Sequence, residues 1–556
     1  MKANHRRVLN KENLGWLAGF LAILWLLVRS GLNPKRLNYP CQRAALQISA
    51  GWISAILALF AGSIVLKRIL KFSSAAFVTF GAVWFTLTLF EPSLSNQKND
   101  ITLPVWESDS PTSTIFVLDS IPPTPGSLAA GDASVPDEHL SDFALDTLIN
   151  MMEEKGIYLH KTAGNPDGIV AADDIVIIKG NFQWTSYNTT NTDRIKGLIW
   201  RILLHPDGFT GEIVVCDNTH IYGTGINADD NNSDDPAQCI IDVVNTFYAK
   251  GYPVYLKDWN DFYNTVAWEY SVGDPYDGFV YEIDTKVTYP KFQTPSGQYY
   301  ISLKYGIWNQ EASSYDDSRL CIIDFPVLKA HFNAGATIAV KNWVGVLTTA
   351  YSLGRYGGID PMHDDFLFGP YALVARVMAV TFPRLSIIDA TWTTTEGPIS
   401  LSWVVNTGIL LASTDPVASS WYAAKYILTP IANFPHETDP ENESVEFYGY
   451  NLRYWTEFLV DSAGYDLTRD SAQISVFNRE IVAPDYFCGD ANGDGDVNLL
   501  DILYLIDHLY GDPPGPVPYP VESGDANGDG DINLLDILYL IDYLYGDPSG
   551  PDPLCP

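Results

Sequence analysis

Three long apolar runs open the chain, at residues 14–28, 48–66 and 72–90. The second and third are long enough to cross a bilayer as helices, and the first extends as far as Leu32. The first run lacks a small-residue cleavage site, which favours an uncleaved anchor over a signal peptide. We therefore expect residues 1–92 to form a membrane anchor of about three transmembrane helices. The alternative is a soluble protein in which these runs are buried helices.

The basic residues flanking the runs indicate the orientation of this anchor. The segments before the first run and between the second and third runs hold seven Lys and Arg together, against four between the first and second runs. Because basic loops stay on the cytoplasmic side, the carboxyl-terminal part is expected outside the cytoplasm. A linker rich in Pro, Ser and Asp follows, which we place at 93–113.

From about residue 114 to 484 the apolar pattern alternates between strands and helices. Short buried strands are expected at 114–118, 174–178, 212–216, 254–256, 320–324, 385–389 and 407–411. Amphipathic helices are expected after Ser141, over 192–203 and after Asp235-Pro236. Residues 266–307 are instead rich in Tyr, Thr and Val, with turn residues between them, and predict an antiparallel insertion. The expected fold is an α/β domain with a mainly parallel sheet.

The last 70 residues contain one 25-residue pattern twice, GDANGDGDVNLLDILYLIDHLYGDP and GDANGDGDINLLDILYLIDYLYGDP. Oxygen-bearing side chains recur at the alternate positions that a calcium-binding loop uses, with a glycine at the sharp turn. The predicted calcium ligands are Asp490, Asn492, Asp494, Asp496, Asn498 and Asp501 in the first copy, and Asp525, Asn527, Asp529, Asp531, Asn533 and Asp536 in the second. Asp496 and Asp531 are at the position where the backbone carbonyl normally binds.

In this pattern, Asp closes each loop, and each loop leads into one helix with none before it. It therefore resembles a type I dockerin, from Cys488 to the chain end. The resemblance implies a small all-α domain at 485–556 that binds two calcium ions and docks a cohesin-like protein domain. In the family, two positions at the start of each helix help to contact the cohesin. Here they hold Leu499 and Leu500, then Leu534 and Leu535, where polar residues are usual.

Composition excludes some classes of function. The formal net charge of −34 argues against nucleic-acid binding, which needs a basic surface. The six cysteines form no closely spaced cluster of the kind that holds zinc or an iron–sulfur centre. Cys488 and Cys555 bracket the repeated module, and we expect them to form a disulfide in an oxidising compartment. Cys216 and Cys239 are a second possible pair.

Polar side chains follow several of the predicted strands, where ligands bind in such sheets. The expected ligand-binding residues are Lys179, Asn181, Lys329, Lys341 and Asn342. Lysine is scarce in this acidic chain, and a group of cations with Asn donors suits a phosphate or carboxylate. The catalytic candidates are His331, His363 and Asp389, while His363, Asp389, Glu396 and Asp415 are candidates for a second divalent metal site. Each residue also has a structural interpretation, such as capping a turn or a helix.

Four fragments carry a second resemblance: VIIKGN, FPVLKAHFNAGATIAVKNWVG, LSIIDATWTTTEGP and GILLASTDPVA. They resemble the domain-of-unknown-function family 362, which implies a fold and a site location but no reaction.

Three functions remain open. The first is a membrane-anchored, outward-facing protein that binds an anionic ligand and docks a partner through its calcium-dependent tail. The second is a metal-assisted hydrolase or transferase, in which Lys329 and Lys341 hold the anion and His331 or His363 handles protons. The third is a surface scaffold or adhesion protein.

Overall fold

The computed structural model describes residues 101–122, 131–184, 186–219, 226, 238–348, 368–397, 403–445, 447–481, 488–493, 496–511, 515–518, 521–528, 531–546, 550–551 and 553–554. The chain divides into two units, Met1–Ser95 and Asn96–Pro556, and every described residue belongs to the second. The expected membrane anchor lies outside the described residues. In the described part, no helix has the length and apolar character to span a bilayer.

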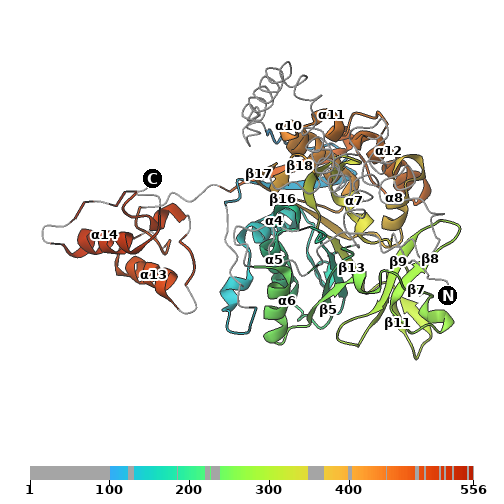
Figure 1. Cartoon of the computed structure of the whole chain (residues 1–556), viewed down its shortest axis with the longest axis horizontal. Helices are drawn as coiled ribbons and strands as arrows, with labels where there is room; N and C mark the ends of the chain where they lie inside the picture. Colours follow the sequence, from blue (N-terminus) through green and yellow to red (C-terminus); the bar gives the residue numbers. More distant parts are fainter. Residues whose placement is uncertain are drawn as a thin grey trace, which may run out of the picture. The chain divides into compact units, whose positions relative to one another are not determined.

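A large mixed sheet forms the middle of the central domain, with the strand order β18-β1-β17-β16-β13-β4-β5-β6 (Figure 1). Its parallel part comprises β4 (Ile175–Lys179), β5 (Glu212–Asp217), β6 (Val254–Asp258), β13 (Leu320–Asp324) and β16 (Leu385–Thr394). The other edge holds β17 (Val404–Ser413), antiparallel to both β16 and β1 (Ser113–Asp119), and β18 (Ile474–Glu480), parallel to β1. Off this order, β14 (Val327–His331) pairs in parallel with β16, and β15 (Gly335–Thr337) pairs antiparallel with β14. The expected α/β fold with a mainly parallel sheet is thus confirmed.

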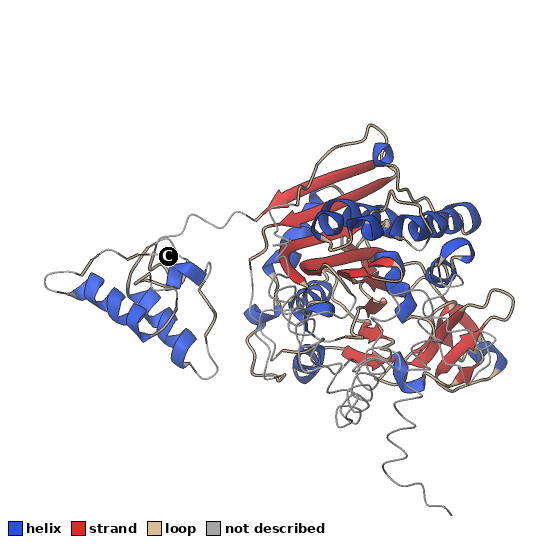
Figure 2. Ribbon diagram, turned by 45° about the horizontal axis from the view of Figure 1, so that its top comes forward, coloured by secondary structure: helices blue, strands red, loops and turns tan. Residues whose placement is uncertain are grey.

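Both faces of this sheet are buried, which explains its continuous apolar strands. In β4, Ile175 and Ile177 belong to one hydrophobic core, whereas Val176 and Ile178 belong to the other. One core is covered by α4 (Phe143–Glu154), α5 (Thr192–Leu203) and α6 (Ile240–Ala249). The opposite core is covered by α7 (Ala339–Asn342), α8 (Leu373–Met378), α9 (Pro416–Tyr422) and α12 (Tyr448–Glu457). Figure 2 shows the strands lying between helices.

The ends of the first helices differ in detail from the sequence expectation. Asp142, not Ser141, caps α4, because its side chain accepts the Leu145 amide at 2.8 Å. Cys239 precedes α6, while the expected opening at 235–236 lies outside the described residues. Shorter elements are β2 (His160–Lys161), β3 (Val170–Ala171), α10 (Thr429–Ile431) and α11 (Pro435–Thr438).

A second sheet forms the predicted insertion between β6 and β13. Its strands, in the order β12-β11-β10-β9-β8-β7, are β7 (Val266–Ala267), β8 (Gly278–Tyr281), β9 (Thr288–Gln293), β10 (Tyr300–Ser302), β11 (Gly306–Asn309) and β12 (Ser314–Asp316). All neighbours are antiparallel except β7 and β8. Phe279, Tyr289 and Phe292 join the core on the α7 side of the main sheet.

Residues 101–112, which include most of the expected linker, contact the central domain. The Trp106 indole donates to the Ser471 carbonyl at 3.0 Å, and Trp106 also bridges to Val476 in β18. The Tyr422 hydroxyl donates to the Pro104 carbonyl at 3.1 Å. This segment therefore covers part of the core near β18 and α9.

The carboxyl-terminal module is all-α, with α13 (Leu499–Tyr510) and α14 (Leu534–Tyr545). Its small core contains Ile502 and Leu505 from α13 with Ile537 and Leu540 from α14. The two helices thus repeat the same packing with the same inward positions.

Candidate functional site

The site candidates meet at one point of the parallel sheet, where the strand order reverses. From β4 the chain proceeds through β5 to β6 on one side, and after the insertion it returns to β13 on the other side of β4. Ligands of open α/β sheets bind at such a point, outside the carboxyl ends of the strands. Lys179 ends β4 and is paired in register with Asp324, which ends β13, and Asp217 ends the neighbouring β5.

Lys179 and Asp217 form a buried ion pair. Their side chains are 1% and 3% exposed, and Lys179 Nζ lies 2.9 Å from Asp217 Oδ1. The Asp217 carboxylate also accepts the backbone amides of Phe182 and Asn218, at 2.7 and 2.9 Å. A Cβ at Gly345 would lie 2.6 Å from both Lys179 Nζ and Asp217 Oδ1. The glycine in the sequence KNWVG therefore makes room for the ion pair.

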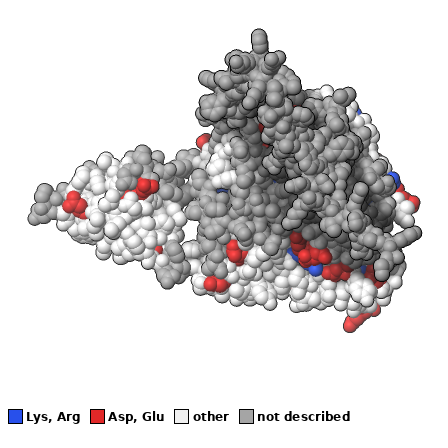
Figure 3. All heavy atoms as spheres, in the orientation of Figure 1, with Lys and Arg blue, Asp and Glu red and all other residues white. Residues whose placement is uncertain are grey.

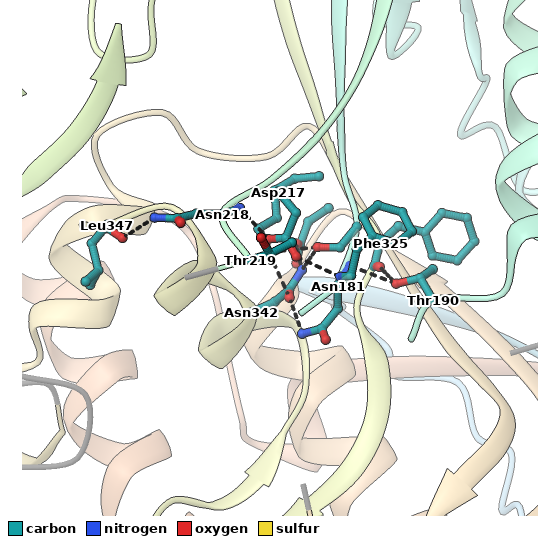
Figure 4. Close-up of polar contacts among 12 residues, drawn as sticks. Asn181, Thr190, Asp217, Asn218, Thr219, Phe325, Asn342 and Leu347 are labelled. Carbon is teal, nitrogen blue, oxygen red and sulfur yellow. Dashed lines mark hydrogen bonds and ion pairs between the residues drawn. The ribbon is translucent and has the colours of Figure 1, made fainter. Parts of the chain in front are cut away.

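Asn342, the last residue of α7, connects the strand ends. Its Oδ1 accepts Lys179 Nζ at 3.0 Å and Asn181 Nδ2 at 2.9 Å. Its Nδ2 donates to Asp324 Oδ1 at 2.8 Å. Figure 4 shows Asn181 and Asn342 facing one another, with Asp217 nearby. A single amide thus ties α7 to β4 and β13.

Lys329, from β14, joins the same network. Its Nζ donates to Asn181 Oδ1 at 3.0 Å and to the Asn188 carbonyl at 2.8 Å. Both acceptors are neutral, and no carboxylate of the described residues forms an ion pair with this ammonium, although the nearby charge of Asp217 favours it. Burial, and then the nearby charge of Lys341, lower the pKa of Lys329 to about 7.

Lys341 is the third buried lysine, on α7 directly before Asn342. The Phe368 ring lies near its ammonium, with the ring centre 6.0 Å from Nζ. No hydrogen bond or ion pair reaches its ammonium from the residues that the structure describes. Burial, and then the charge of Lys179, lower its pKa to about 7. The structure thus brings together all five expected ligand-binding residues, Lys179, Asn181, Lys329, Lys341 and Asn342.

Asp324 belongs to the cluster but was not among the sequence candidates. Burial raises the pKa of its carboxyl to about 7, against the opposing effect of Lys179. Its Oδ2 has no hydrogen-bond partner in the described structure. The sequence signal that could have identified Asp324 is its place at the end of a buried strand, because Lys179 and Asp217 also end buried strands.

The catalytic candidates lie in different surroundings. His331 ends β14, and its Nδ1 accepts the Asn333 amide at 3.2 Å. Asp389, fully buried in β16, accepts the amides of Asn191 and Thr391 at 2.8 and 3.0 Å, and burial raises its pKa. Those bonds hold the start of α5 against the sheet. His363 lies outside the described residues.

The candidates for a second metal have structural partners. Asp415 caps α9 by accepting the amides of Val417 and Ala418 at 2.7 and 2.9 Å. Glu396 accepts Asn433 Nδ2 at 2.9 Å. Among the described residues, no three His, Cys, Asp or Glu side chains are grouped so that they could hold a metal ion.

In the carboxyl-terminal module, the aspartate that closes each loop is buried in the first turn of the following helix. Asp501 accepts the amides of Asn492 and Asn498 at 3.1 and 2.7 Å, and Asp536 repeats this with Asn527 and Asn533 at 3.2 and 2.7 Å. Asn498 and Asn533 cap the helices by accepting the amides of the second following residues at 2.8 Å. Asp494 and Asp529 lie outside the described residues.

The chemistry of these loops suits a hard cation. Asp490, Asp501, Asp525 and Asp536 are at most 4% exposed, and residues 488–556 contain no Lys or Arg to pair with them. Buried carboxylates that lie this close together in the sequence favour a positive charge among them. Calcium, which prefers carboxylate and amide oxygens, fits this donor set. The backbone carbonyls of Asp496 and Asp531 accept hydrogen bonds at 3.1 Å from the side-chain amides of Asn498 and Asn533.

The cysteines divide into two groups. Cys488 is disulfide-bonded, and its expected partner Cys555 lies outside the described residues. Cys216 and Cys239 are free thiols, so the possible pair between them is wrong. Cys216 lies within β5 and its thiol contacts the Val214 carbonyl in the same strand, whereas Cys239 directly precedes α6.

Two family models match the chain. The one described as "Domain of unknown function (DUF362)" matches residues 297–425, and the one described as "Dockerin type I domain" matches residues 488–545. The first range includes Asp324, Lys329, Lys341, Asn342 and Gly345, whereas Lys179 precedes it. No curated protein and no solved structure gives a significant match. The chain therefore carries a DUF362 domain, which contains these five residues of the candidate site, and a type I dockerin domain at its carboxyl end.

Proposed function

We propose that the central domain binds a small anion, a phosphate or a carboxylate, at the lysine cluster formed by Lys179, Lys329 and Lys341. The observation that carries this proposal is the buried Lys341 ammonium, which has no hydrogen-bond or ion-pair partner in the described part. Three cations and two carboxylates, Asp217 and Asp324, meet at the switch point of the sheet. A bound anion would satisfy Lys341 and offset the repulsion that lowers the pKa of Lys329.

The acidic surface of the protein makes this cluster distinctive. The chain has 67 acidic and 33 basic residues, and on the face in Figure 3 acidic groups are visible at more places than basic ones. Exposed regions of this kind repel anions. The buried lysines are therefore the part of the described structure best suited to attract one.

Sulfate is a suitable probe, because its charge stays constant near neutral pH. We expect isothermal titration of the full chain to show sulfate binding that weakens as the pH rises from 6 to 8. Both Lys329 and Lys341 have a pKa of about 7, so they carry a positive charge below this pH and lose it above. Near pH 7, binding should also take up protons, because the anion favours the charged lysines.

Two variants sharpen this measurement. Lys341→Met should weaken sulfate binding by about 10- to 100-fold, the effect of one charge-assisted hydrogen bond. Lys155→Met removes an exposed lysine whose Nζ lies 3.8 Å from Glu107, and it should leave binding unchanged. Equal affinity in all three proteins, or affinity independent of pH, would contradict the proposal.

We propose further that the carboxyl-terminal module docks a cohesin domain through two apolar stripes. Type I dockerin modules typically bind calcium and pair with cohesins. Each helix here exposes five large hydrophobic side chains, each 41–61% exposed: Leu499, Leu500, Leu503, Ile506 and Tyr510 on α13, and Leu534, Leu535, Leu538, Ile541 and Tyr545 on α14. Such contiguous apolar surfaces indicate an interaction site. The fitting partner is a cohesin whose contact surface is apolar rather than polar.

The duplication gives this docking proposal a specific test. Leu500→Lys alone should reduce binding to a responsive type I cohesin by only about twofold, because the α14 stripe remains intact. Leu500→Lys combined with Leu535→Lys should abolish binding in a pull-down against a panel of type I cohesins. Tyr248→Lys, at an exposed residue of α6, is the control and should bind normally. Undiminished binding by the double variant would contradict docking through the stripes.

The proposed location is a membrane-anchored protein with both folded domains outside the cytoplasm. The apolar runs of residues 1–92 and the disulfide-bonded Cys488 support it, because disulfides persist in oxidising compartments. Protease added to intact cells should remove the carboxyl-terminal module while residues 1–92 stay with the membrane fraction. A module that the protease reaches only after cell lysis would contradict this orientation.

A further inference from the structure

Lys341 differs from the other two buried lysines of the cluster. Lys179 donates to three oxygens, on Asp217, Gly180 and Asn342, and Lys329 donates to two. Lys341 donates to none in the described structure. Its side chain keeps 7% of its surface exposed, against 1% for Lys179 and 2% for Lys329. Of the three amines, Lys341 is the one that is both unbonded and most open to solvent.

An amine in this position has the features of a nucleophile. A lysine is activated when it is desolvated and lies next to other cations, because both effects favour the neutral amine. Lys341 is buried, and the charge of Lys179 disfavours its ammonium form. Lys341 and Lys329 repel one another as well. At neutral pH the two can share one proton, so that one amine is charged while the other is neutral.

We propose that Lys341 forms an imine with the aldehyde or ketone group of a small carboxylate, whose charge is held by Lys329 and Asn181. This inference rests on the proposed function and deepens it, since it names 2-oxo carboxylates and related carbonyl anions as the ligand class. The charged Lys329 and the Asn181 amide bind the carboxylate end. The neutral Nζ of Lys341 reaches the carbonyl carbon beside it.

The chemistry needs no further reagent. The Lys341 nitrogen forms a bond to the carbonyl carbon, and the carbonyl oxygen receives the proton that the nitrogen gives up. The resulting carbinolamine loses its hydroxyl group together with the proton that remains on the nitrogen, as water, which leaves a carbon–nitrogen double bond. Nothing is oxidised or reduced, and water is the only product besides the imine.

Reductive trapping tests the inference directly. The full chain is incubated with pyruvate and sodium cyanoborohydride, and labelled lysines are identified by peptide mass spectrometry. At pH 7, Lys341 should be labelled at least ~10-fold faster than the exposed Lys155, because more of it is neutral. Acetaldehyde, which lacks the carboxylate, should show a smaller preference for Lys341. The rate at Lys341 should peak near pH 7 and fall on either side, since one lysine must be charged and the other neutral.

Two variants separate this inference from anion binding. Lys341→Arg keeps the positive charge but has no neutral amine, so it should lose the label while binding sulfate more tightly than Lys341→Met. Lys155→Arg should keep both sulfate binding and the label on Lys341. Thermal unfolding checks that each variant folds. If pyruvate labels lysines only in proportion to their exposure while sulfate still binds, the imine is wrong and the anion site stands. If sulfate binding is also absent, the proposed function fails as well.

Discussion

Replacing Lys179 by methionine should lower the free energy of unfolding of the central domain by about 3–5 kcal/mol. The substitution leaves Asp217 buried, 3% exposed, without its cation, and it also removes the only charge that opposes the raised pKa of Asp324. Urea unfolding of the full chain, followed by tryptophan fluorescence, measures the effect because Trp259, Trp343, Trp421 and Trp455 are fully buried in this domain.

An exposed ion pair provides the matched control for this prediction. Lys425 Nζ lies 3.0 Å from Glu441, with side chains 33% and 53% exposed. Lys425→Met should cost about 0–1 kcal/mol, the usual value for a surface pair. Adding Asp217→Asn to Lys179→Met should recover part of the lost stability, since the side chain that lost its cation is then neutral. Equal losses for Lys179→Met and Lys425→Met would contradict a structural role for the buried pair.

Calcium removal is expected to unfold the carboxyl-terminal module while the central domain stays folded. Without the cation, each loop would keep buried negative charges in a module whose sequence contains no Lys or Arg. Metal binding and folding are coupled in modules of this size. In hydrogen exchange of the full chain, chelator should remove the amide protection of α13 and α14. The protection of α5 in the same molecule is the internal control and should persist.

Single-loop variants extend the calcium prediction to its ligands. Asp501→Ala and Asp536→Ala should each lower the calcium stoichiometry from two to one, because each removes the residue that closes one loop. Asp316→Ala, in the second sheet, should retain both ions. Full protection of α13 and α14 in chelator, or unchanged stoichiometry in the two loop variants, would contradict calcium-dependent folding of the module.

Local pattern predicted much of the fold. Residues 192–203 form α5 and 320–324 form β13 with the expected bounds, because helix periodicity and a short apolar run are each unambiguous there. The relative direction of neighbouring strands was harder to predict. The hairpin of β16 and β17 is antiparallel and longer than expected, since an apolar strand has the same pattern whichever way its neighbour runs. β18 was missed, since its last three residues are exposed and polar.

The site was predictable to the extent that strand ends carry polar residues. Lys179, Asn181, Lys329, Lys341 and Asn342 stand out because lysine is scarce and parallel strands end at one edge. Asp324 was not recognised as a site residue, because an aspartate at the end of a strand more often caps a turn. The role of Gly345 depends on a contact with β4 and β5, more than 120 residues earlier in the chain. No local pattern reports a contact of that kind.

The most direct test of the anion site is a crystal structure of the full chain soaked with selenate below pH 7, with the anion located by anomalous scattering of selenium. The proposed function predicts a selenate within hydrogen-bond distance of Lys341 Nζ, and with Lys329 as its second cationic neighbour. Selenate bound only on the protein surface, with the Lys341 ammonium still lacking a partner, would contradict it.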